Sequence, residues 1–504
     1  MRNLTRFTIL LLLVSAAAGN WTTSGGDRLR SGLSPEVGPD SARLLWEGSL
    51  SSWFGMPVFT WEDRLVTMRF QSIDYAPVVC HDLATGDTLW TRDFPGANSR
   101  SLPIGFRDGR VYAVNYQESR YDTLFALDPD DGSTLWVAAV PVDMSISESA
   151  SYAPDGDLLV TASDFRIARI DCATGDTVWT ARRVWPVSGS TDVVAFGERL
   201  YAYGGDIGSL YLMAFDVATG ALVDTLHIPD THPGGPLPQA APMVGSNGTI
   251  YAHKVGDNVT AIEDRGDSLK LLWSTELSGT APYYSAFGHF ATGPDGSVYA
   301  ASWGRVIRLD PETGAVTDSS PFIQDTSGVI FHCRISVGAD GTVYVSSDGH
   351  APLGGLYALT PGLDLLWYEP VPRLNTSGPA IGRDGVLAVA GDGTVLRVYG
   401  PAAGLAARGR AQPAGLLLAA RPNPFRGSTR IEYLLERASD VNVLVHDVLG
   451  RQVRVLTAGA GTPGLHSLTW DGRDAAGRRV GPGVYVCRIL AGGSVESVRL
   501  TLTD

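Results

Sequence analysis

Short runs of alternating apolar and polar residues, separated by tight-turn signals, recur along most of the chain. One recurring phrase is a turn pair followed by β-branched or aromatic residues, as in DGRVYAV at 108–114 and DGSVYAA at 295–301. Asp-Gly before alternating apolar residues is typical of a β-hairpin, because glycine supplies the positive φ of the turn at little cost. The aligned apolar residues fall at 65, 111, 158, 200, 250, 298, 343 and 387. Intervals of 42 to 50 residues predict eight four-stranded units, which are the blades of a β-propeller.

A second phrase follows the first and combines an acidic residue, a glycine four positions later and a tryptophan eight positions later. It is clearest as DLATGDTLW at 82–90, DPDDGSTLW at 128–136 and DCATGDTVW at 171–179. Other copies depart from it, with aspartate in the tryptophan slot at 224 and 318, and with Trp273 and Trp367 displaced by an insertion and a deletion. We expect the blades with these departures to dock less regularly.

The ends of the repeat array predict how the ring closes. The strand LLWEG at 44–48 precedes the first hairpin, whereas the last repeat ends at VLRVYG, 395–400, with no following copy of that strand. Pairing these two segments removes two exposed sheet edges. The sequence therefore predicts a closed propeller over about 40–400.

The sequence pattern changes after the predicted propeller. Residues 401–415 form an Ala/Gly/Pro-rich linker without periodicity, and 416–504 contain alternating strands separated by Pro-Asn-Pro, Leu-Gly-Arg and Asp-Gly turns. This pattern predicts a small β-sandwich. The expected fold class is all-β, an eight-bladed β-propeller plus a small C-terminal immunoglobulin-like β-sandwich.

The first residues predict export. Basic residues, an apolar run from Phe7 to Val14 and small residues up to Ala18 are typical of a secretory signal peptide over 1–18. The apolar run is too short to span a bilayer, and no cysteine follows it that could carry a lipid. We therefore expect an exported monomer without a transmembrane segment.

Charge and cysteine content narrow the function classes. The formal net charge of −14 disfavours nucleic acid and anionic lipid as partners. The four cysteines lie far apart and form no adjacent or CxxC pair, so we interpret them as small apolar side chains within strands. They are Cys80, Cys172, Cys333 and Cys487.

The second phrase resembles the tryptophan-docking motif of eight-bladed propellers of the pyrroloquinoline quinone (PQQ) type. That architecture is shared by quinoprotein alcohol dehydrogenases and the outer-membrane assembly factor BamB. The resemblance implies that the tryptophan lies between neighbouring blades and is capped by the turn that the glycine makes possible, which is a structural role. The matching residues are Asp82, Gly86, Trp90, Ala126, Asp128, Gly132, Trp136, Asp171, Gly175 and Trp179.

The C-terminal region is similar to the FlgD-like immunoglobulin fold and to the type A sorting domain of the type IX secretion system. This resemblance implies passage across the outer membrane to the cell surface or medium, with the secretion machinery as a partner. Hook-capping proteins share the fold. The matching residues are Pro422, Asn423, Pro424, Phe425, Tyr433, Asp447, Gly450, Trp470, Asp471, Gly472, Gly477, Gly483, Val484 and Tyr485.

Catalytic signatures are not recognised in the sequence. A PQQ enzyme needs adjacent cysteines against the quinone and a bound Ca²⁺, and the chain has no such cysteine pair. The acidic pair in PDGD at 154–157 lacks the distal glutamate of a calcium loop, which favours simple turns. The nine histidines are scattered. We therefore predict no catalytic residues, no metal and no cofactor.

The remaining candidate site is the funnel formed by loops that enter the innermost strand of each blade. Aromatic and polar side chains there could bind a protein, peptide or glycan, although simple packing between blades also accounts for the aromatic residues. The excursions at 229–242 and 347–355 are candidate contact loops. The candidate residues are Trp53, Phe54, Arg100, Ser147, Glu148, Asp192, Gln239, Tyr283, Tyr284, His332 and Asn375.

Three functional hypotheses follow. The favoured one is an exported, non-catalytic propeller that acts as a binding or scaffold protein at the cell surface or in the medium. The second is a propeller enzyme, either PQQ-dependent or with another funnel site. The third is a BamB-like assembly scaffold at the outer membrane, which would place the protein in the periplasm.

Overall fold

The computed structural model describes most of the chain from residue 20 onward. The described residues are 20–49, 58–69, 75–94, 99–117, 123–140, 142, 149–161, 166–183, 192–206, 209–228, 241–254, 258–277, 290–302, 305–321, 323, 333–347, 355–371, 379–390, 395–401, 418–421, 423–435, 439–447, 451–462, 464–491 and 494–503. The predicted signal peptide and most of the predicted linker lie outside them. Among the described residues, no helix has the length and apolar character needed to cross a bilayer.

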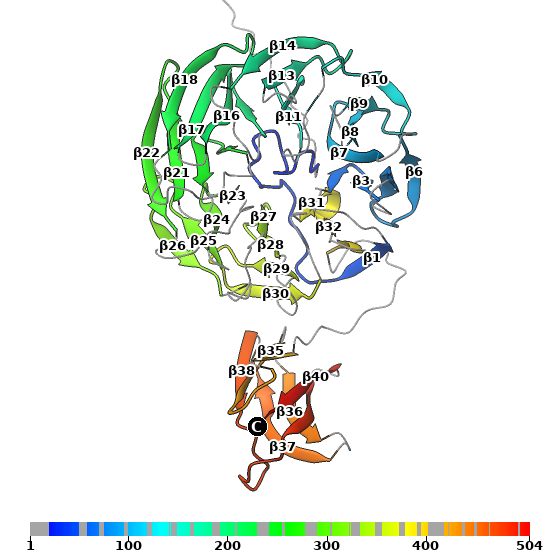
Figure 1. Ribbon diagram of the computed structural model, residues 1–504, viewed down its shortest axis with the longest axis vertical. Helices are drawn as coiled ribbons and strands as arrows, with labels where there is room; N and C mark the ends of the chain where they lie inside the picture. The colour runs from blue at the N-terminus through cyan, green and yellow to red at the C-terminus, as the bar shows by residue number, and fades with distance from the viewer. Residues whose placement is uncertain are drawn as a thin grey trace, which may run out of the picture.

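The described part of the chain is almost entirely β-structure, which confirms the predicted all-β class. Eight antiparallel sheets follow one another along the chain and are arranged in a ring (Figure 1). We call them blades 1 to 8. The innermost strands are β2 (Phe59–Trp61), β7 (Ser99–Arg107), β11 (Ser151–Tyr152), β15 (Val194–Phe196), β19 (Met243–Val244), β23 (Phe290–Thr292), β27 (Cys333–Val337) and β31 (Ala380–Ile381).

The second strand of each blade carries the aligned apolar residue of the hairpin phrase. All eight of these residues have no exposed surface, so the sequence period corresponds to a buried position in every blade. The second strands are β3 (Arg64–Met68), β8 (Arg110–Gln117), β12 (Leu158–Thr161), β16 (Arg199–Asp206), β20 (Ile250–Lys254), β24 (Val298–Ser302), β28 (Val343–Ser347) and β32 (Leu387–Ala390).

The third and outermost strands complete each blade. The third strands are β5 (Val78–Asp82), β9 (Thr123–Leu127), β13 (Arg166–Ile170), β17 (Ser209–Asp216), β21 (Asn258–Asp264), β25 (Arg305–Leu309), β29 (Gly355–Leu359) and β33 (Val395–Tyr399). The outermost strands are β6 (Thr88–Arg92), β10 (Thr134–Val137), β14 (Thr177–Arg182), β18 (Leu222–His227), β22 (Leu269–Glu276), β26 (Val316–Ser319), β30 (Leu365–Glu369) and β1 (Leu44–Ser49).

Two short elements depart from this plan. Strand β4 (Tyr75–Ala76) pairs in parallel with β7 and gives blade 2 a fifth strand. A single 3-10 turn, Arg383–Gly385, joins β31 to β32 in blade 8.

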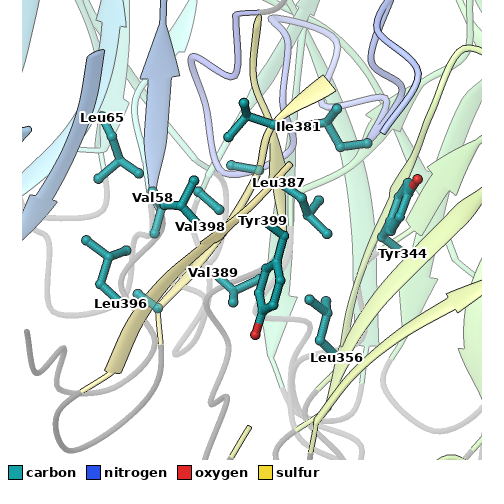
Figure 2. Close-up of a cluster of buried hydrophobic side chains, with 14 of the residues drawn as sticks. Val58, Leu65, Tyr344, Leu356, Ile381, Leu387, Val389, Leu396, Val398 and Tyr399 are labelled. Atoms are coloured by element: carbon teal, nitrogen blue, oxygen red, sulfur yellow. The ribbon is translucent and has the colours of Figure 1, made fainter. Parts of the chain in front are cut away.

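The ring closes through the N-terminal strand, as predicted. Strand β1 pairs antiparallel with β33, with Trp46 opposite Val398. The hydrophobic cluster at this closure contains side chains of blade 1, such as Leu65, of blade 7, such as Leu356, and of blade 8, such as Leu387 and Tyr399 (Figure 2). Apolar burial across three blades therefore stabilises the closed ring.

The C-terminal region forms a separate two-sheet sandwich. One sheet contains β34 (Leu418–Arg421), β35 (Thr429–Leu435) and β38 (Gly464–Trp470). The other contains β37 (Gln452–Gly461), β36 (Ser439–Asp447), β39 (Gly483–Ala491) and β40 (Ser494–Leu502). Trp470 is fully buried, and its ring centroid lies 5.1 Å from that of Tyr485 and 5.5 Å from that of Phe425.

Candidate functional site

The tryptophans of the second phrase lie in the seams between blades. The indole Nε1 of Trp90 donates to the Pro129 carbonyl at 2.8 Å, and that of Trp136 donates to the Cys172 carbonyl at 3.0 Å. In both cases the acceptor belongs to the outer turn of the next blade. Trp179 repeats the contact at Val217.

The glycine of each phrase receives the tryptophan of the preceding blade. A Cβ atom on Gly132 would lie 2.7 Å from the ring of Trp90, and one on Gly86 would lie 2.7 Å from the ring of Trp46. Gly86 therefore packs in one seam between blades, whereas Trp90, four residues later, packs in the next seam. Each copy of the phrase is a two-sided joint, which accounts for its repetition along the chain.

The acidic residue of the phrase holds the turn in shape. The Oδ1 atom of Asp82 accepts the backbone N–H groups of Ala84 and Thr85, at 3.0 and 2.8 Å. The Gly86 N–H donates to the Asp82 carbonyl at 2.9 Å. These are Asx-type turn contacts, so the aspartate has a structural role here.

Of the blades expected to dock less regularly, one docks like the others. Trp273 donates to the Pro311 carbonyl at 3.0 Å and packs on Gly314, so the expectation is wrong for this blade. The insertion before Trp273 is absorbed by a longer β21–β22 hairpin, in which Glu263 pairs with Lys270 and Asp264 with Leu269.

The other departures have different contacts. Asp224, in a tryptophan slot, accepts the Leu269 N–H of the next blade at 2.7 Å. Asp318 instead forms an ion pair with Arg308 of its own blade, at 3.2 Å. Trp367 donates to the Pro39 carbonyl at 3.3 Å, because blade 8 has no copy of the turn to receive it.

Acid should weaken the ring through the docking turns. Three carboxylates in the docking turns, those of Asp171, Asp216 and Asp310, accept hydrogen bonds from the threonine three residues later. The donor is the hydroxyl and the backbone N–H of the threonine at Asp216 and Asp310, and the backbone N–H at Asp171. These bonds lower the pKa of each carboxyl. A carboxyl whose pKa is lower in the folded than in the unfolded state stabilises the fold above the unfolded value of about 4 and loses that contribution as the pH falls through the folded value. We expect the melting temperature to fall as the pH is lowered below about 4.

The matched variant replaces all three carboxyls by amides, since Asn keeps the acceptor oxygen and does not titrate. The triple variant Asp171→Asn, Asp216→Asn, Asp310→Asn should show a smaller decrease in melting temperature over the same pH range. The exposed Glu312→Gln, which changes a neighbouring carboxyl outside the acceptor position, serves as the control. Parallel melting curves for the triple variant and the wild type would contradict the assignment.

The centre of the ring is occupied by the chain itself. Residues 20–39, which we call the axial segment, lie inside the ring of innermost strands, where Figure 1 shows them in dark blue. Trp21 and Thr60 exchange both backbone hydrogen bonds, at 2.8 and 3.0 Å. The Ser31 carbonyl accepts from Thr292 at 2.7 Å. The segment is therefore held mainly by the backbone of the innermost strands.

The axial segment contacts the eight blades in their order along the chain. In seven blades the partner is the last or next-to-last residue of the innermost strand, so the segment lies at the end of the axis where these strands finish. In blade 3 the partner is Ser149, just before the strand. The pairs in blade order are Trp21 with Thr60, Thr22 with Phe106, Ser24 with Ser149, Arg28 with Ala195, Leu29 with Val244, Ser31 with Thr292, Gly32 with Val337 and Ser34 with Ile381.

A buried ion pair anchors the middle of the axial segment. The Arg30 guanidinium contacts the Asp192 carboxylate, and the two side chains are 4% and 0% exposed. The same Arg30 nitrogen donates to Ser24 Oγ at 2.6 Å, and the Ser149 N–H donates to the Asp192 carboxylate at 3.3 Å. The pair links blade 4 to a segment 162 residues earlier in the chain.

Asp27 organises the turn that presents Arg30. Its Oδ1 accepts the backbone N–H groups of Leu29 and Ser31, at 2.9 and 3.0 Å, and its Oδ2 accepts the Ser31 hydroxyl at 2.9 Å. Burial nevertheless raises the pKa of this carboxyl above its ordinary value. Arg30 itself has a φ of 57°, which a side-chain-bearing residue adopts only when the surroundings impose it.

Most of the ligand residues predicted from the sequence lie outside the described residues. Trp53, Phe54, Ser147, Glu148, Gln239, Tyr283, Tyr284, His332 and Asn375 are all in this group, as are nearly all of the two contact-loop excursions. Arg100 lies in strand β7, opposite Tyr116. Asp192 is described, and its carboxylate is wholly buried against Arg30 of the axial segment.

The axial segment was not predicted from the sequence. Its signal is the phrase TSGGDRLRSGLS at 23–34, where glycines and small polar residues surround two arginines. The segment shows no alternation of apolar and polar residues, because backbone contacts fix its position.

The acidic turn at 154–157 is a structural ion pair. Arg169 contacts both Asp155 and Asp157, the latter at 2.8 Å, which agrees with the interpretation as a turn. Among the described side chains, no three His, Cys, Asp or Glu residues gather as a metal site. Cys80 and Cys487 are buried as free thiols within strands, and Cys172 is a partly buried free thiol in a turn.

The ring of four-stranded blades and the two-sheet sandwich define the chain as a β-propeller protein with an appended immunoglobulin-like domain. Residues 75–319 match the family model described as outer membrane protein assembly factor BamB, and 425–493 match the FlgD Ig-like domain. Comparison with curated proteins yields no match.

Solved structures with a similar fold come from natural and designed proteins. BamB from Moraxella catarrhalis has a TM-score of 0.51 at 16% identity, covering 71% of this chain and 99% of that one. The computationally designed Ika8 protein has a TM-score of 0.51 at 14% identity, with the same coverage. A quinohemoprotein alcohol dehydrogenase from Comamonas testosteroni reaches 0.43 at 13% identity, covering 93% of this chain and 82% of that one. At these identities the likeness shows the fold alone.

Proposed function

We propose that the chain is an exported, non-catalytic propeller that serves as a binding or scaffold module. The observation that carries this proposal is the axial segment. One end of the ring axis is filled by residues 20–39, whose contacts with all eight blades make the ring a closed scaffold. We propose that the ligand binds to the predicted ligand loops, which precede the innermost strands in the chain.

The C-terminal sandwich supports an extracytoplasmic location. The match to the FlgD Ig-like domain and the match to BamB both point outside the cytoplasm. We propose that the sandwich directs the propeller through the type IX secretion machinery to the cell surface or medium. Protease digestion of intact cells tests this: a propeller that is protected in intact cells and digested only after the outer membrane is opened would favour the periplasmic, BamB-like alternative.

A binding screen tests the proposed function. The full chain from residue 19 onward is the correct probe, because an isolated 40–400 fragment would lack the axial segment. We expect binding on a glycan or peptide array that the double change Tyr283→Ala, Tyr284→Ala weakens at least tenfold, since removing large aromatic contacts from a binding surface typically costs more than 1 kcal/mol each. Glu312→Ala, on an outer turn, is the control and should bind as the wild type.

The enzyme alternative has its own readout. Addition of PQQ and Ca²⁺ should leave the protein without a bound-quinone absorption band. A stoichiometric band, or array binding that is unchanged in the Tyr283→Ala, Tyr284→Ala variant, would contradict the proposed binding function.

A further inference from the structure

We propose that the end of the ring axis where the innermost strands finish is a peptide-binding site, and that residues 21–34 of the chain are its resident ligand. The ligand class is an extended peptide rich in glycine and serine that presents one arginine to Asp192. This inference concerns the contacts of residues 21–34, whereas the function proposed above is tested at Tyr283 and Tyr284, so either can fail without the other.

The backbone contacts are those of a bound peptide. Main-chain groups of Trp21, Thr22, Leu29, Ser31 and Gly32 bond to the innermost strands of five blades. Such main-chain bonds supply affinity with little regard to side chains, as when an extended peptide adds to a sheet edge. The receptor groups belong to blades that fold from residues 44–399, which lie after the ligand in the chain.

Asp192 supplies the selectivity. Its carboxylate has no exposed surface and receives the Arg30 guanidinium, which also bonds to Ser24 Oγ within the ligand. A peptide without arginine at this place would leave a buried carboxylate uncompensated. Arg28 provides a contrast, since it donates a long hydrogen bond of 3.5 Å to the Ala195 carbonyl and is only partly buried.

Close packing explains why the ligand needs glycine around the arginine. A Cβ atom on Gly32 would lie 2.6 Å from the Cβ of Ala291, and one on Gly25 would lie 2.6 Å from the Cβ of Arg30. The φ angle of Gly32 is 64°. The site therefore accepts a folded-back Gly-Gly-Asp-x-x-Arg-Ser-Gly chain and excludes bulkier sequences.

The chain that connects the ligand to the blades is accessible. Pro35, Val37 and Asp40 are exposed, with Val37 at 52%. A protease site inserted between Asp40 and Ser41 would allow the folded full-length chain to be cut after residue 40. The cut leaves the ligand as a separate peptide and keeps strand β1 in the ring.

The first measurement follows the fate of the cut peptide. After cleavage and size-exclusion chromatography, mass spectrometry should find residues 20–40 still bound to the wild-type chain and to the Arg28→Ala chain. The Arg30→Ala chain should lose the peptide, because a buried charge pair has been broken. Loss of the peptide from the wild type, or equal retention in both variants, would overturn the proposal.

The second measurement uses only the wild-type ring and synthetic peptides. A fluorescent peptide of residues 20–40 replaces the cut segment during a cycle of urea addition and removal, with the uncut chain as the control for recovery of the fold. We expect the Arg28→Ala peptide to bind within about fivefold of the wild-type peptide, and the Arg30→Ala peptide to bind on the order of 100-fold more weakly. A refolded ring that takes up no peptide, or that binds both variant peptides equally, would overturn the proposal.

Discussion

Replacing Asp192 by alanine is expected to lower the free energy of unfolding of the propeller by about 3–5 kcal/mol, because the change leaves the Arg30 guanidinium buried without its counter-charge. Both side chains are almost completely buried, so solvent cannot compensate for the lost partner. The measurement is urea denaturation followed by tryptophan fluorescence, with the midpoint and slope of the propeller transition compared between variant and wild type.

The ion pair between Arg169 and Asp155 is the matched control, because the side chain of Asp155 is 61% exposed. Asp155→Ala should therefore cost at most about 1 kcal/mol. The double change Arg30→Met, Asp192→Leu should recover much of the loss, since apolar side chains can replace a buried ion pair at little cost. If Asp192→Ala costs no more than Asp155→Ala, the ion pair does not anchor the axial segment.

Opening one seam should have an effect of similar size. Trp136 lies between blades 2 and 3, is 8% exposed and donates to the Cys172 carbonyl. Trp136→Ala is expected to cost about 3–5 kcal/mol through lost contacts and the cavity left behind. Gly175→Ala should cost about 1–3 kcal/mol, because its Cβ would lie 2.6 Å from the Trp136 ring.

The free-energy losses of Trp136→Ala and Gly175→Ala should not add, because the methyl group of Gly175→Ala clashes only when the Trp136 indole is present. In the double variant the total loss should fall short of the sum by about 1 kcal/mol or more. Gly109→Ala isolates backbone strain, because Gly109 also has a positive φ, of 70°, and nothing lies within 4 Å of its would-be Cβ. Additive costs, or a Gly109→Ala loss equal to that of Gly175→Ala, would show that the seam contact is not the cause.

The ring could be predicted because each repeat places an apolar residue at the same buried position of its blade. Leu65 and Leu387 occupy one buried position in blades 1 and 8, and a hydrophobic period of this kind is visible in a single sequence. The closing strand was predictable for a related reason, since an unpaired β1 and an incomplete last blade each expose an edge.

The partner of each docking tryptophan was not predictable to the residue. Gly86 and Trp90 belong to one phrase, yet they serve different seams, and only the arrangement in space shows that Trp46 packs on Gly86 and Trp90 on Gly132. Trp273 illustrates the same limit, because an insertion that breaks the sequence spacing is absorbed by a longer β21–β22 hairpin and leaves the contact intact.

The axial segment could not be predicted from the sequence, for a different physical reason. Periodicity reports side-chain burial, whereas this segment is bound by its backbone and by one arginine. Asp192 was identified from the sequence as a polar residue near the funnel, but its partner lies 162 residues away and cannot be inferred from local pattern. The other candidate ligand residues lie outside the described part of the chain and remain predictions.

The ordered contacts of the axial segment also bear on how this propeller could change during evolution. If neighbouring repeats recombined so that a blade was gained or lost, the seams built from a tryptophan on a glycine could form again, because they share the same contact. Here a ninth blade would have no counterpart in the ordered contacts of Trp21 to Ser34, and deletion of blade 7 would leave the Gly32 and Ser34 groups that bond to Val337 without partners. The axial segment therefore fits a ring of one size, and we expect the number of blades to stay constant even while the sequences of the repeats diverge.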